Sequence, residues 1–283
     1  MLFTEDLSTL REHIKTWKQE GLIIGFVPTM GNLHEGHLSL IEEALNHCDR
    51  VVSSIFVNPL QFSANEDLDT YPRTLAEDKK RLQAIDTSLL FSPSAKTIYP
   101  KPLSEQTLVS VPTIGQILCG ASRPGHFAGV ATVVAKLFNM VQPDIAVFGK
   151  KDYQQLHIIR KMTEDLNLPI QIIGVETCRE ASGLAMSSRN GYLSDEDRCT
   201  AAYIKATLDH AAEALQNEHA DYVSIENHCV ANLSSKGFNV DYFVIRSRQT
   251  LFKPSEDTKQ LVILVAAYLG KTRLIDNLEV TLE

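Results

Sequence analysis

Two histidines, His34 and His37, follow an apolar run and stand at the start of a predicted helix. Residues 26–37 read FVPTMGNLHEGH, and apolar residues recur at helical spacing from Leu38 onward. Backbone N–H groups at a helix start bind phosphate, and the glycines at positions 31 and 36 let phosphate approach the backbone. The two imidazoles add hydrogen-bond donors or positive charge to the same ligand. The segment therefore favours a phosphate site.

The same residues also fit two plainer interpretations, an ordinary surface turn and half of a metal site. A zinc site would need further Cys, Asp or His ligands at short spacing, and the sequence near His34 and His37 supplies none. The other polar segments of the chain have to decide between a phosphate site and a surface turn.

Two further segments carry cations where a phosphate could be bound. Gly149-Lys150-Lys151-Asp152 follows a predicted strand and opens a helix, with Asp152 at the N-cap position. A lysine at this strand end can neutralise a phosphate, and we favour Lys151 over Lys150; the alternative is a solvated lysine pair. The loop at 185–191 offers two serines and Arg189, which suit a triphosphate, although an ordinary polar linker has the same composition.

Amide side chains supply a different kind of site. The segments 56–62 and 153–155 place Gln61 and Gln155 beside apolar residues. A neutral amide orients a carboxylate without a tight ion pair, which matters if the carboxylate has to act as a nucleophile. The alternative is that these glutamines lie on the surface. The turn Arg123–Phe127 either closes over a substrate or is purely structural, and the sequence leaves both interpretations open.

The composition indicates a folded protein of about two domains, at roughly 150 residues each. The 283 residues are 44% hydrophobic and 22% charged, with a net charge of −8. Such an acidic chain lacks the basic face of a nucleic-acid-binding protein. The five cysteines are scattered without a C-x-x-C pair, which favours a reducing compartment. The longest apolar run, Leu261–Leu269, is too short to cross a bilayer, and the N-terminus resembles no signal peptide. We expect a cytoplasmic protein with neither nucleic-acid nor membrane partners.

Alternating strands and helices position these residues. The pattern predicts strands at 22–27, 50–57, 88–91, 145–148 and 170–175, helices at 7–20, 38–48, 75–84, 130–140 and 153–166, and a loop-rich stretch at 93–112. This alternation predicts an α/β fold with a doubly wound, mostly parallel, Rossmann-like sheet. Ligands of such sheets bind at the carboxyl ends of the strands near the switch point, where the two histidines, Gln61 and Gly149 are expected.

After Gly183 the pattern changes. It predicts long helices at 195–216 and 224–236 and strands at 240–245 and 261–267. These elements indicate a second, smaller α+β domain. We therefore expect a first domain at 1–176 and a second at 177–283.

Six motifs occur in register along the chain, at residues 27–37, 55–62, 71–74, 123–127, 151–155 and 186–193. Together they resemble the pantothenate synthetase (pantoate–β-alanine ligase) family, and the similarity runs from about Leu22 to the C-terminus. The His-x-Gly-His element (HxGH motif) and the Met-Ser-Ser-Arg loop are also similar to the two signature motifs of the wider nucleotidyltransferase and class I aminoacyl-tRNA synthetase superfamily.

The resemblance implies ATP-dependent ligation in two steps, within pantothenate and coenzyme A biosynthesis. The carboxylate of pantoate attacks the α-phosphate of ATP, which gives pantoyl adenylate and pyrophosphate. The amine of β-alanine then attacks the adenylate, which gives pantothenate and AMP. The resemblance also implies Mg2+ with the ATP, a homodimer, ATP and pantoate binding by the first domain, and closure of the second domain over the active site. The alternatives are another adenylyl or nucleotidyl transferase on the same scaffold and a non-catalytic nucleotide-binding protein.

Carried over residue by residue, the resemblance assigns catalysis to His37, His34, Lys151 and Arg189. His37 is the family's proton donor, and stabilising phosphate charge would be an alternative role for it. Gln61 and Gln155 would hold pantoate, with Gln61 also near β-alanine. The implied ATP contacts are Met30, Gly31, Asn32, Leu33, His34, Glu35, Gly36, His37, Gly149, Lys150, Lys151, Asp152, Cys178 (through its main chain), Met186, Ser187, Ser188 and Arg189. No metal ligand is assigned, although Glu77 and Asp78 form an acidic pair that relatives also carry.

Overall fold

The chain forms two compact units. The computed structural model describes residues 1–62, 68–217 and 220–282. Unit 1 comprises Met1–Lys150 with Gln154–Glu176, and unit 2 comprises Lys151–Tyr153 with Thr177–Glu283. The short segment Lys151–Tyr153 thus groups with unit 2, whereas the sequence places it in the first domain. The reason is that Asn277 and Glu279 near the C-terminus hydrogen-bond to Lys151 and Tyr153.

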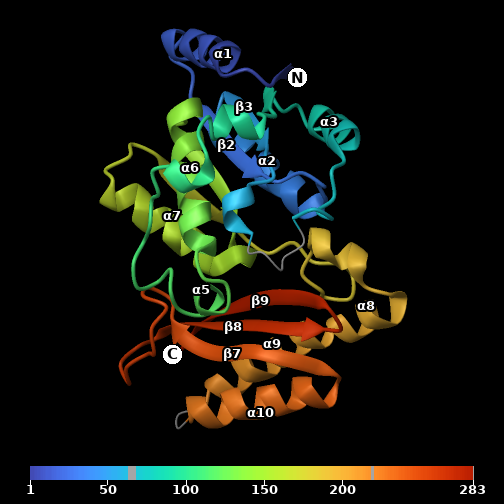
Figure 1. Ribbon diagram of the computed structural model, residues 1–283. Helices are drawn as coiled ribbons and strands as arrows, with labels where there is room; N and C mark the ends of the chain where they lie inside the picture. Colours follow the sequence, from blue (N-terminus) through green and yellow to red (C-terminus); the bar gives the residue numbers. More distant parts are fainter. Residues whose placement is uncertain (63–67, 218–219, 283) are drawn as a thin grey trace. The chain divides into compact units, whose positions relative to one another are not determined.

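Unit 1 contains a six-stranded parallel sheet with the strand order β1-β4-β3-β2-β5-β6 (Figure 1). Its strands are β1 (Leu2–Thr4), β2 (Ile24–Thr29), β3 (Arg50–Ile55), β4 (Leu89–Phe91), β5 (Ile145–Gly149) and β6 (Gln171–Val175). From β2 the chain first builds outward through β3 and β4 and then returns to the other side of β2 with β5. The doubly wound sheet is confirmed, and its switch point lies between β2 and β5.

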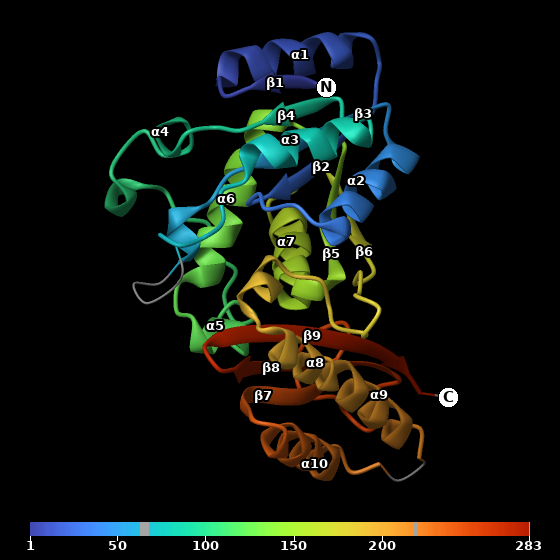
Figure 2. The same cartoon turned by 90° about the vertical axis from the view of Figure 1, so that its right-hand side faces the viewer.

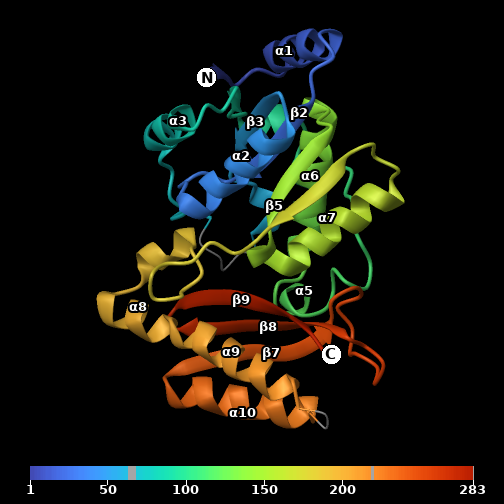
Figure 3. The ribbon, with the colours of Figure 1, turned by 180° about the vertical axis from the view of Figure 1, so that it is seen from behind.

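Helices cover both faces of this sheet. They are α1 (Leu7–Gln19), α2 (Glu35–His47), α3 (Leu75–Ala84), α4 (Ala95–Ile98), α5 (Cys119–Ser122), α6 (His126–Val141) and α7 (Tyr153–Asp165). Figures 2 and 3 show α2 and α6 on opposite faces. On one face Ile41 of α2 and Leu82 of α3 pack with Val27 and Val51. On the other, Phe138 of α6 stacks edge-on against Phe26 and Phe148. Alternate strand residues therefore face different helices, as the period of two requires.

Several boundaries in unit 1 differ from the sequence expectation. Strand β2 continues through Pro28, because its pairing with β5 is limited to Gly25 and Phe26 and leaves no ladder bond there for the missing N–H. Helix α2 begins at Glu35, so His37 lies in its first turn and not in the preceding loop. The stretch 93–112 contains α4 and a short 3-10 helix, η2 (Leu103–Glu105). Strand β1 was not expected at all, since three residues show no periodicity.

Unit 2 is a three-stranded antiparallel sheet with helices on one face (Figure 3). Its elements are α8 (Asp195–Ala201), α9 (Tyr203–Leu215), α10 (Tyr222–Ser235), β7 (Phe238–Ser247), β8 (Gln260–Leu269) and β9 (Thr272–Thr281). The predicted helix at 195–216 is two helices that meet at Ala202. The sequence missed β9, because the charged residue Asp276 occupies the register of Leu274 and Val280 and interrupts the apolar alternation.

Candidate functional site

The turn between β2 and α2 adopts a backbone that few residues tolerate. Gly31 has φ 83° and Asn32 has φ 50°, so two successive residues lie in the left-handed region. A Cβ at position 31 would come within 3.1 Å of both Asp78 Oδ2 and Ile55 Cγ2. Glycine is therefore required by conformation and by space. His34, with extended backbone angles, then caps α2, and its carbonyl accepts the N–H of His37 in the first helical turn at 2.7 Å.

The two histidines are in ring contact, and a hydrogen bond fixes the tautomer of one of them. The ring centroids of His34 and His37 lie 4.1 Å apart. The backbone N–H of His34 donates to Nδ1 of His37 at 3.3 Å. An acceptor nitrogen carries no proton, so the neutral His37 ring carries its proton on Nε2. In the neutral ring, Nε2 is therefore the nitrogen that donates.

Asp78, in the first turn of α3, stabilises the turn between β2 and α2 through hydrogen bonds. Its carboxylate accepts N–H bonds from Asn32 (3.0 Å) and Leu33 (2.8 Å) and a hydroxyl bond from Thr74 (3.1 Å). The residue is only 1% exposed, so these three donors replace the water that an ionised carboxylate would lose. Asp78 thus ties the phosphate-type turn to a helix that begins more than 40 residues later in the chain.

The acidic pair at 77–78 does not form a metal site of its own. Asp78 uses its carboxylate on the turn, while Glu77 lies within ion-pair distance of Lys80 (4.0 Å) and Arg81 (3.6 Å). Within residues 1–62, 68–217 and 220–282 no group of three or more His, Cys, Asp or Glu side chains is arranged to hold a metal ion. The described residues therefore contain no cage of three or more such side chains for a metal ion.

Gln61 lies in the short 3-10 helix η1 (Pro59–Gln61) and contacts this turn through Met30. The hydrogen bonds of its neighbour Asn58 determine how the Gln61 amide is oriented. Asn58 Oδ1 accepts the backbone N–H of Leu60 (3.3 Å), and Asn58 Nδ2 donates to the backbone carbonyl of Gly129 (3.1 Å). The Asn58 amide is thereby fixed, and its Nδ2 also donates to Gln61 Oε1 at 3.1 Å. Gln61 must then present its NH2 group, which reaches Met30 Sδ at 3.1 Å.

A buried tyrosine and a Gly/Pro turn support this arrangement. The Tyr99 hydroxyl donates to Asn58 Oδ1 at 2.7 Å, and burial raises the pKa of this hydroxyl, which keeps it a donor. His126 Nδ1 lies 2.8 Å from the main-chain oxygen of Gln61, while Arg123 donates to His126 Nε2 at 3.0 Å. The turn at 123–127 therefore hydrogen-bonds to the backbone of Gln61. This contact favours a structural role for the turn over closure across a substrate.

The neighbouring glutamines of α7 differ in their roles. Gln154 is 5% exposed; it accepts the N–H of Cys119 (3.1 Å) and donates to the carbonyls of Ile114 (2.7 Å) and Ile117 (2.8 Å). Its amide is fully occupied in holding the loop before α5. Gln155 is half-buried, and its side chain forms no hydrogen bond with another described residue, so its amide is available to a ligand.

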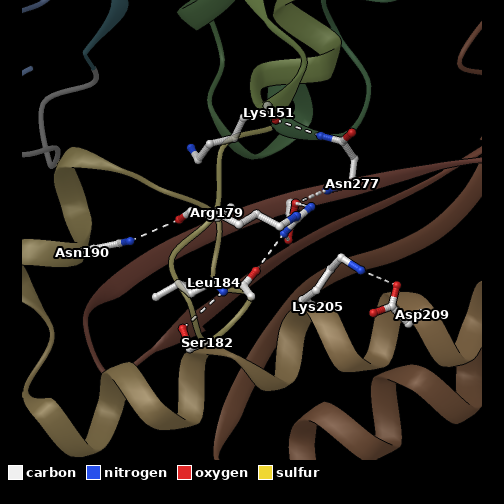
Figure 4. Close-up of polar contacts among 11 residues, drawn as sticks. Lys151, Arg179, Ser182, Leu184, Asn190, Lys205, Asp209 and Asn277 are labelled. Atoms are coloured by element: carbon white, nitrogen blue, oxygen red, sulfur yellow. Dashed lines mark hydrogen bonds and ion pairs between the residues drawn. The ribbon is translucent and has the colours of Figure 1, made fainter. Parts of the chain in front are cut away.

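The two lysines after β5 also differ in their contacts. Lys150 forms an ion pair with Glu176, and both residues belong to unit 1. Lys151 belongs to unit 2, where its main-chain carbonyl accepts a hydrogen bond from Asn277 Nδ2 at 3.0 Å (Figure 4). In that view the Lys151 side chain extends away from Asn277. No acceptor in the described part of the chain lies within hydrogen-bond distance of its Nζ, which keeps the ammonium available.

The loop that carries the other implied ATP contacts is folded back on itself in unit 2. Arg179 and Ala185 form an antiparallel bridge, and the N–H of Met186 donates to the Cys178 carbonyl at 2.9 Å. A carbonyl has a second lone pair, so a main-chain contact of Cys178 to a ligand remains open. Ser187 caps the 3-10 helix η4 (Ser188–Tyr192) by accepting the N–H of Arg189 at 3.2 Å.

Asn190 stabilises this loop through hydrogen bonds to two other residues of the loop. It is buried, and its Nδ2 donates to Glu180 Oε1 at 2.8 Å and to the Ala185 carbonyl at 3.1 Å. Figure 4 shows Asn190 with one contact of its amide drawn. The segment Met186–Arg189 is therefore an ordered turn on a buried anchor.

Comparison with known proteins decides the family. A family model described as pantoate-beta-alanine ligase matches residues 2–279. The chain belongs to the pantoate–β-alanine ligase family. It is 55% identical over 278 residues to pantothenate synthetase of Shewanella loihica, covering 98% of both chains. The crystal structure of pantothenate synthetase from Thermus thermophilus matches with a TM-score of 0.91 at 41% identity, covering 99% of this chain and 100% of that one.

A second solved ligase bears on the ligands. Pantoate–β-alanine ligase from Francisella tularensis, described as complexed with β,γ-ATP and β-alanine, matches with a TM-score of 0.81 at 35% identity. The alignment covers 98% of this chain and 97% of that one. The whole ligase fold, and not a single motif, is thus shared.

Several polar residues that hold the candidate segments of each unit in place escaped the sequence pattern. Asp78, Tyr99, Asn190 and Asn277 are isolated polar residues in ordinary surroundings, and their partners lie far away in sequence. The one available signal was Asn58, which stands beside Gln61 directly after a buried strand.

Proposed function

We propose that the chain is an AMP-forming acid–amino-acid ligase that condenses pantoate with β-alanine, using ATP. One observation carries this proposal: Gln61 Nε2 lies 3.1 Å from Sδ of Met30, on the turn that leads to the start of α2. A neutral amide suited to a carboxylate is thereby adjacent to a phosphate-type turn. An acid and a nucleotide phosphate held at these two points would be in position to react.

In the proposed first step an oxygen of the pantoate carboxylate attacks the α-phosphorus of ATP. The bond to the bridging oxygen breaks, and pyrophosphate leaves with the electron pair. In the second step the amine of β-alanine attacks the carbonyl carbon of pantoyl adenylate, loses a proton, and AMP leaves. Negative charge develops on the phosphates in the first step, where the helix start and His37 Nε2–H can stabilise it.

The assignment of residues follows the family motifs. Gln61 and Gln155 bind pantoate, with Gln61 also near β-alanine. His34, His37, Lys151 and Arg189 stabilise charge on the phosphates. The remaining ATP contacts are those of the segments 30–37, 149–152 and 186–189 and the main chain of Cys178. For His37 the tautomer supports a neutral donor to phosphate oxygen, because the N–H of His34 occupies Nδ1 and opposes a proton there.

Magnesium enters this proposal only as a companion of ATP. The described side chains hold no cluster of ligands for it, so the ion would be held by the phosphates, and neither step above is routed through it. A dependence of the exchange rate on the MgATP concentration, with no magnesium bound by the protein alone in equilibrium dialysis, would support this assignment.

A homodimer in the cytoplasm is the expected state of the protein. Val52 lies in β3 between β2 and β4 and is fully buried within the chain, so its side chain is not part of the surface that such a dimer would use. Sedimentation equilibrium would test the dimer, and fractionation of cells would test the location. No helix in the described residues is long and apolar enough to span a membrane.

The function is tested by following each half of the reaction. Pantoate-dependent ATP–pyrophosphate exchange reports the first step, and release of AMP on addition of β-alanine reports the second. The His37→Ala variant should lose about 2.7–4 kcal/mol of transition-state stabilisation, which is roughly 10²–10³-fold in rate. His47→Ala is the matched control, because His47 lies at the other end of α2 and forms an exposed pair with Glu43.

The outcomes separate the alternatives. Pyrophosphate release with a stable adenylylated product and no amide would indicate another nucleotidyl transferase. Nucleotide binding without exchange in the presence of pantoate would indicate a non-catalytic binding protein. Equal turnover of the His37→Ala and His47→Ala variants would contradict the role of the first histidine.

A further inference from the structure

Strand β9 carries two adjacent buried polar residues that the proposed reaction does not use. Asp276 is 4% exposed and Asn277 is 6% exposed. Buried polar side chains need hydrogen-bond partners, and the identity of those partners shows what the groups hold in place. Both residues lie in unit 2, together with Lys151 and the loop at 178–190.

Asn277 hydrogen-bonds to the main chain of Lys151. Its Nδ2 donates to the Lys151 carbonyl at 3.0 Å, on the side away from the lysine side chain (Figure 4). Lys151 lies in a short 3-10 turn, η3 (Lys150–Asp152), outside the regular pairing of strand and helix. The bond from β9 therefore fixes the position of a backbone that no ladder fixes, and it leaves the ammonium free to reach a ligand.

Asp276 holds Asn277 in turn. Its Oδ1 accepts the backbone N–H of Asn277 at 2.8 Å. The same carboxylate forms a two-pronged pair with Arg179, at 2.6 Å from Nη1 to Oδ2 and 2.9 Å from Nη2 to Oδ1. Arg179 Nη1 also donates to the Gly183 carbonyl at 3.0 Å. A planar bidentate pair is geometrically specific, so it anchors the strand residue that carries the amide.

Arg179 connects this anchor to the segment Met186–Arg189, which the family resemblance assigns to ATP binding. It directly follows Cys178 and is bridged to Ala185, which precedes Met186. One short stretch of β9 thus bonds directly to Lys151 and, through Arg179, to the base of the Met186–Arg189 turn.

We propose that Asn277 is a positioning residue that sets the reach of Lys151 toward the phosphates of ATP. The inference rests on the proposed function, because it assumes that Lys151 acts on ATP. A displacement of about 1 Å in a catalytic group can cost on the order of a hundredfold in rate. Loss of the amide bond should therefore lower the rate of the step that involves the phosphates, through the displacement of Lys151 and not through a substrate contact of Asn277 itself.

The first test is the substitution Asn277→Ala, with Asn239→Ala on the exposed side of β7 as the matched control. We expect a tenfold or greater loss in pantoate-dependent ATP–pyrophosphate exchange for Asn277→Ala and less than a twofold change for the control. The reaction of synthetic pantoyl adenylate with β-alanine should change less than twofold in both, because no pyrophosphate leaves in that step. An equal loss in both half-reactions would indicate general damage and would overturn the proposal.

The second test is a double-substitution cycle with Lys151→Ala. If Asn277 acts through the lysine, Asn277→Ala should cost less than twofold once Lys151 is already alanine. Full additivity of the two losses would overturn the positioning role. Asn277→Asp, which keeps the shape but turns an oxygen toward the Lys151 carbonyl, should be at least as impaired as Asn277→Ala while it melts within a few degrees of wild type. An absence of exchange in the wild-type protein would instead overturn the proposed function, so the two failures are distinguishable.

Discussion

Replacing Asp78 should both destabilise unit 1 and impair adenylation, because one buried carboxylate holds the turn before α2. In Asp78→Ala the N–H groups of Asn32 and Leu33 lose their acceptor. A buried donor left unpaired costs about 1–3 kcal/mol; with Leu33 buried and Asn32 half-buried, the sum is about 3–4 kcal/mol. Asp78→Asn keeps one acceptor and turns an NH2 group toward an N–H donor, so about 1–2 kcal/mol should be lost.

The single tryptophan allows the loss of stability to be measured in unit 1, which contains Asp78. Trp17 is buried in α1 of unit 1, so its fluorescence during urea unfolding reports that unit. The free energy of unfolding should decrease in the order wild type, Asp78→Asn, Asp78→Ala. Thr74→Val removes only the hydroxyl bond and should cost about 1 kcal/mol, while the exposed neighbour in Glu77→Gln should stay within about 0.5 kcal/mol of wild type.

Activity provides the second readout. Because the turn at 30–34 is proposed to face ATP, Asp78→Asn should raise the KM for ATP in the exchange assay more than the KM for pantoate. If Asp78→Asn unfolds and exchanges like wild type, the carboxylate does not hold the turn. If its defect disappears at high magnesium concentration, Asp78 is a metal ligand, and the reasoning from its hydrogen bonds is refuted.

Three further predictions follow from buried contacts. Tyr99→Phe removes the hydroxyl bond to Asn58 and should cost about 1 kcal/mol of unfolding free energy, with a rise in the KM for pantoate and not for ATP in steady-state assays. Gly129→Ala would place a Cβ 2.2 Å from the main-chain oxygen of Leu60, next to the proposed pantoate ligand Gln61, so it should lower the melting temperature and weaken pantoate binding, both measurable by thermal shift. Burial raises the pKa of the Cys229 thiol to about 11 from an ordinary 9.0, so iodoacetamide at pH 8 should alkylate the exposed Cys199 and spare Cys229 in peptide mapping. The same shift means that the native protein binds this proton more tightly than the unfolded chain, so its contribution to stability is complete below pH 9 and is lost as the pH rises toward 11.

Local sequence patterns predict the elements of unit 1 well, because their cause is local. Helix α3 was predicted at its observed bounds, and α1 and β4 to within one residue. The failures have a different physical origin. Strand β9 departs from apolar alternation at Asp276, whose burial is compensated by Arg179 almost a hundred residues earlier. A residue type in a sequence does not reveal a partner at that distance.

The same limit applies to the site. The sequence places His34, His37 and Gln61 after strand ends; in the structure His34 caps α2, His37 lies in its first turn and Gln61 ends η1. The sequence favours Lys151 over Lys150 and names Gln155, but it contains no physical reason for either choice, since each pair has one composition and one local context. Only the tertiary partners separate them: main-chain groups occupy Gln154, and Glu176 neutralises Lys150.

The tertiary partners of Arg123 and Lys150 also bear on how the Gln61 amide could bind a carboxylate. Arg123 lies near Gln61, but it donates to His126 Nε2 and to the Gln61 main-chain oxygen. Lys150, at the end of β5, is paired with Glu176. Two cations of unit 1 that could form an ion pair with a bound carboxylate are therefore engaged elsewhere. A carboxylate held by Gln61 would keep more of its charge available for attack, because a neutral hydrogen bond stabilises it less than a guanidinium or ammonium would. Substitution Gln61→Arg should accordingly tighten pantoate binding in equilibrium titration while it slows pyrophosphate exchange, and a faster exchange would contradict this account.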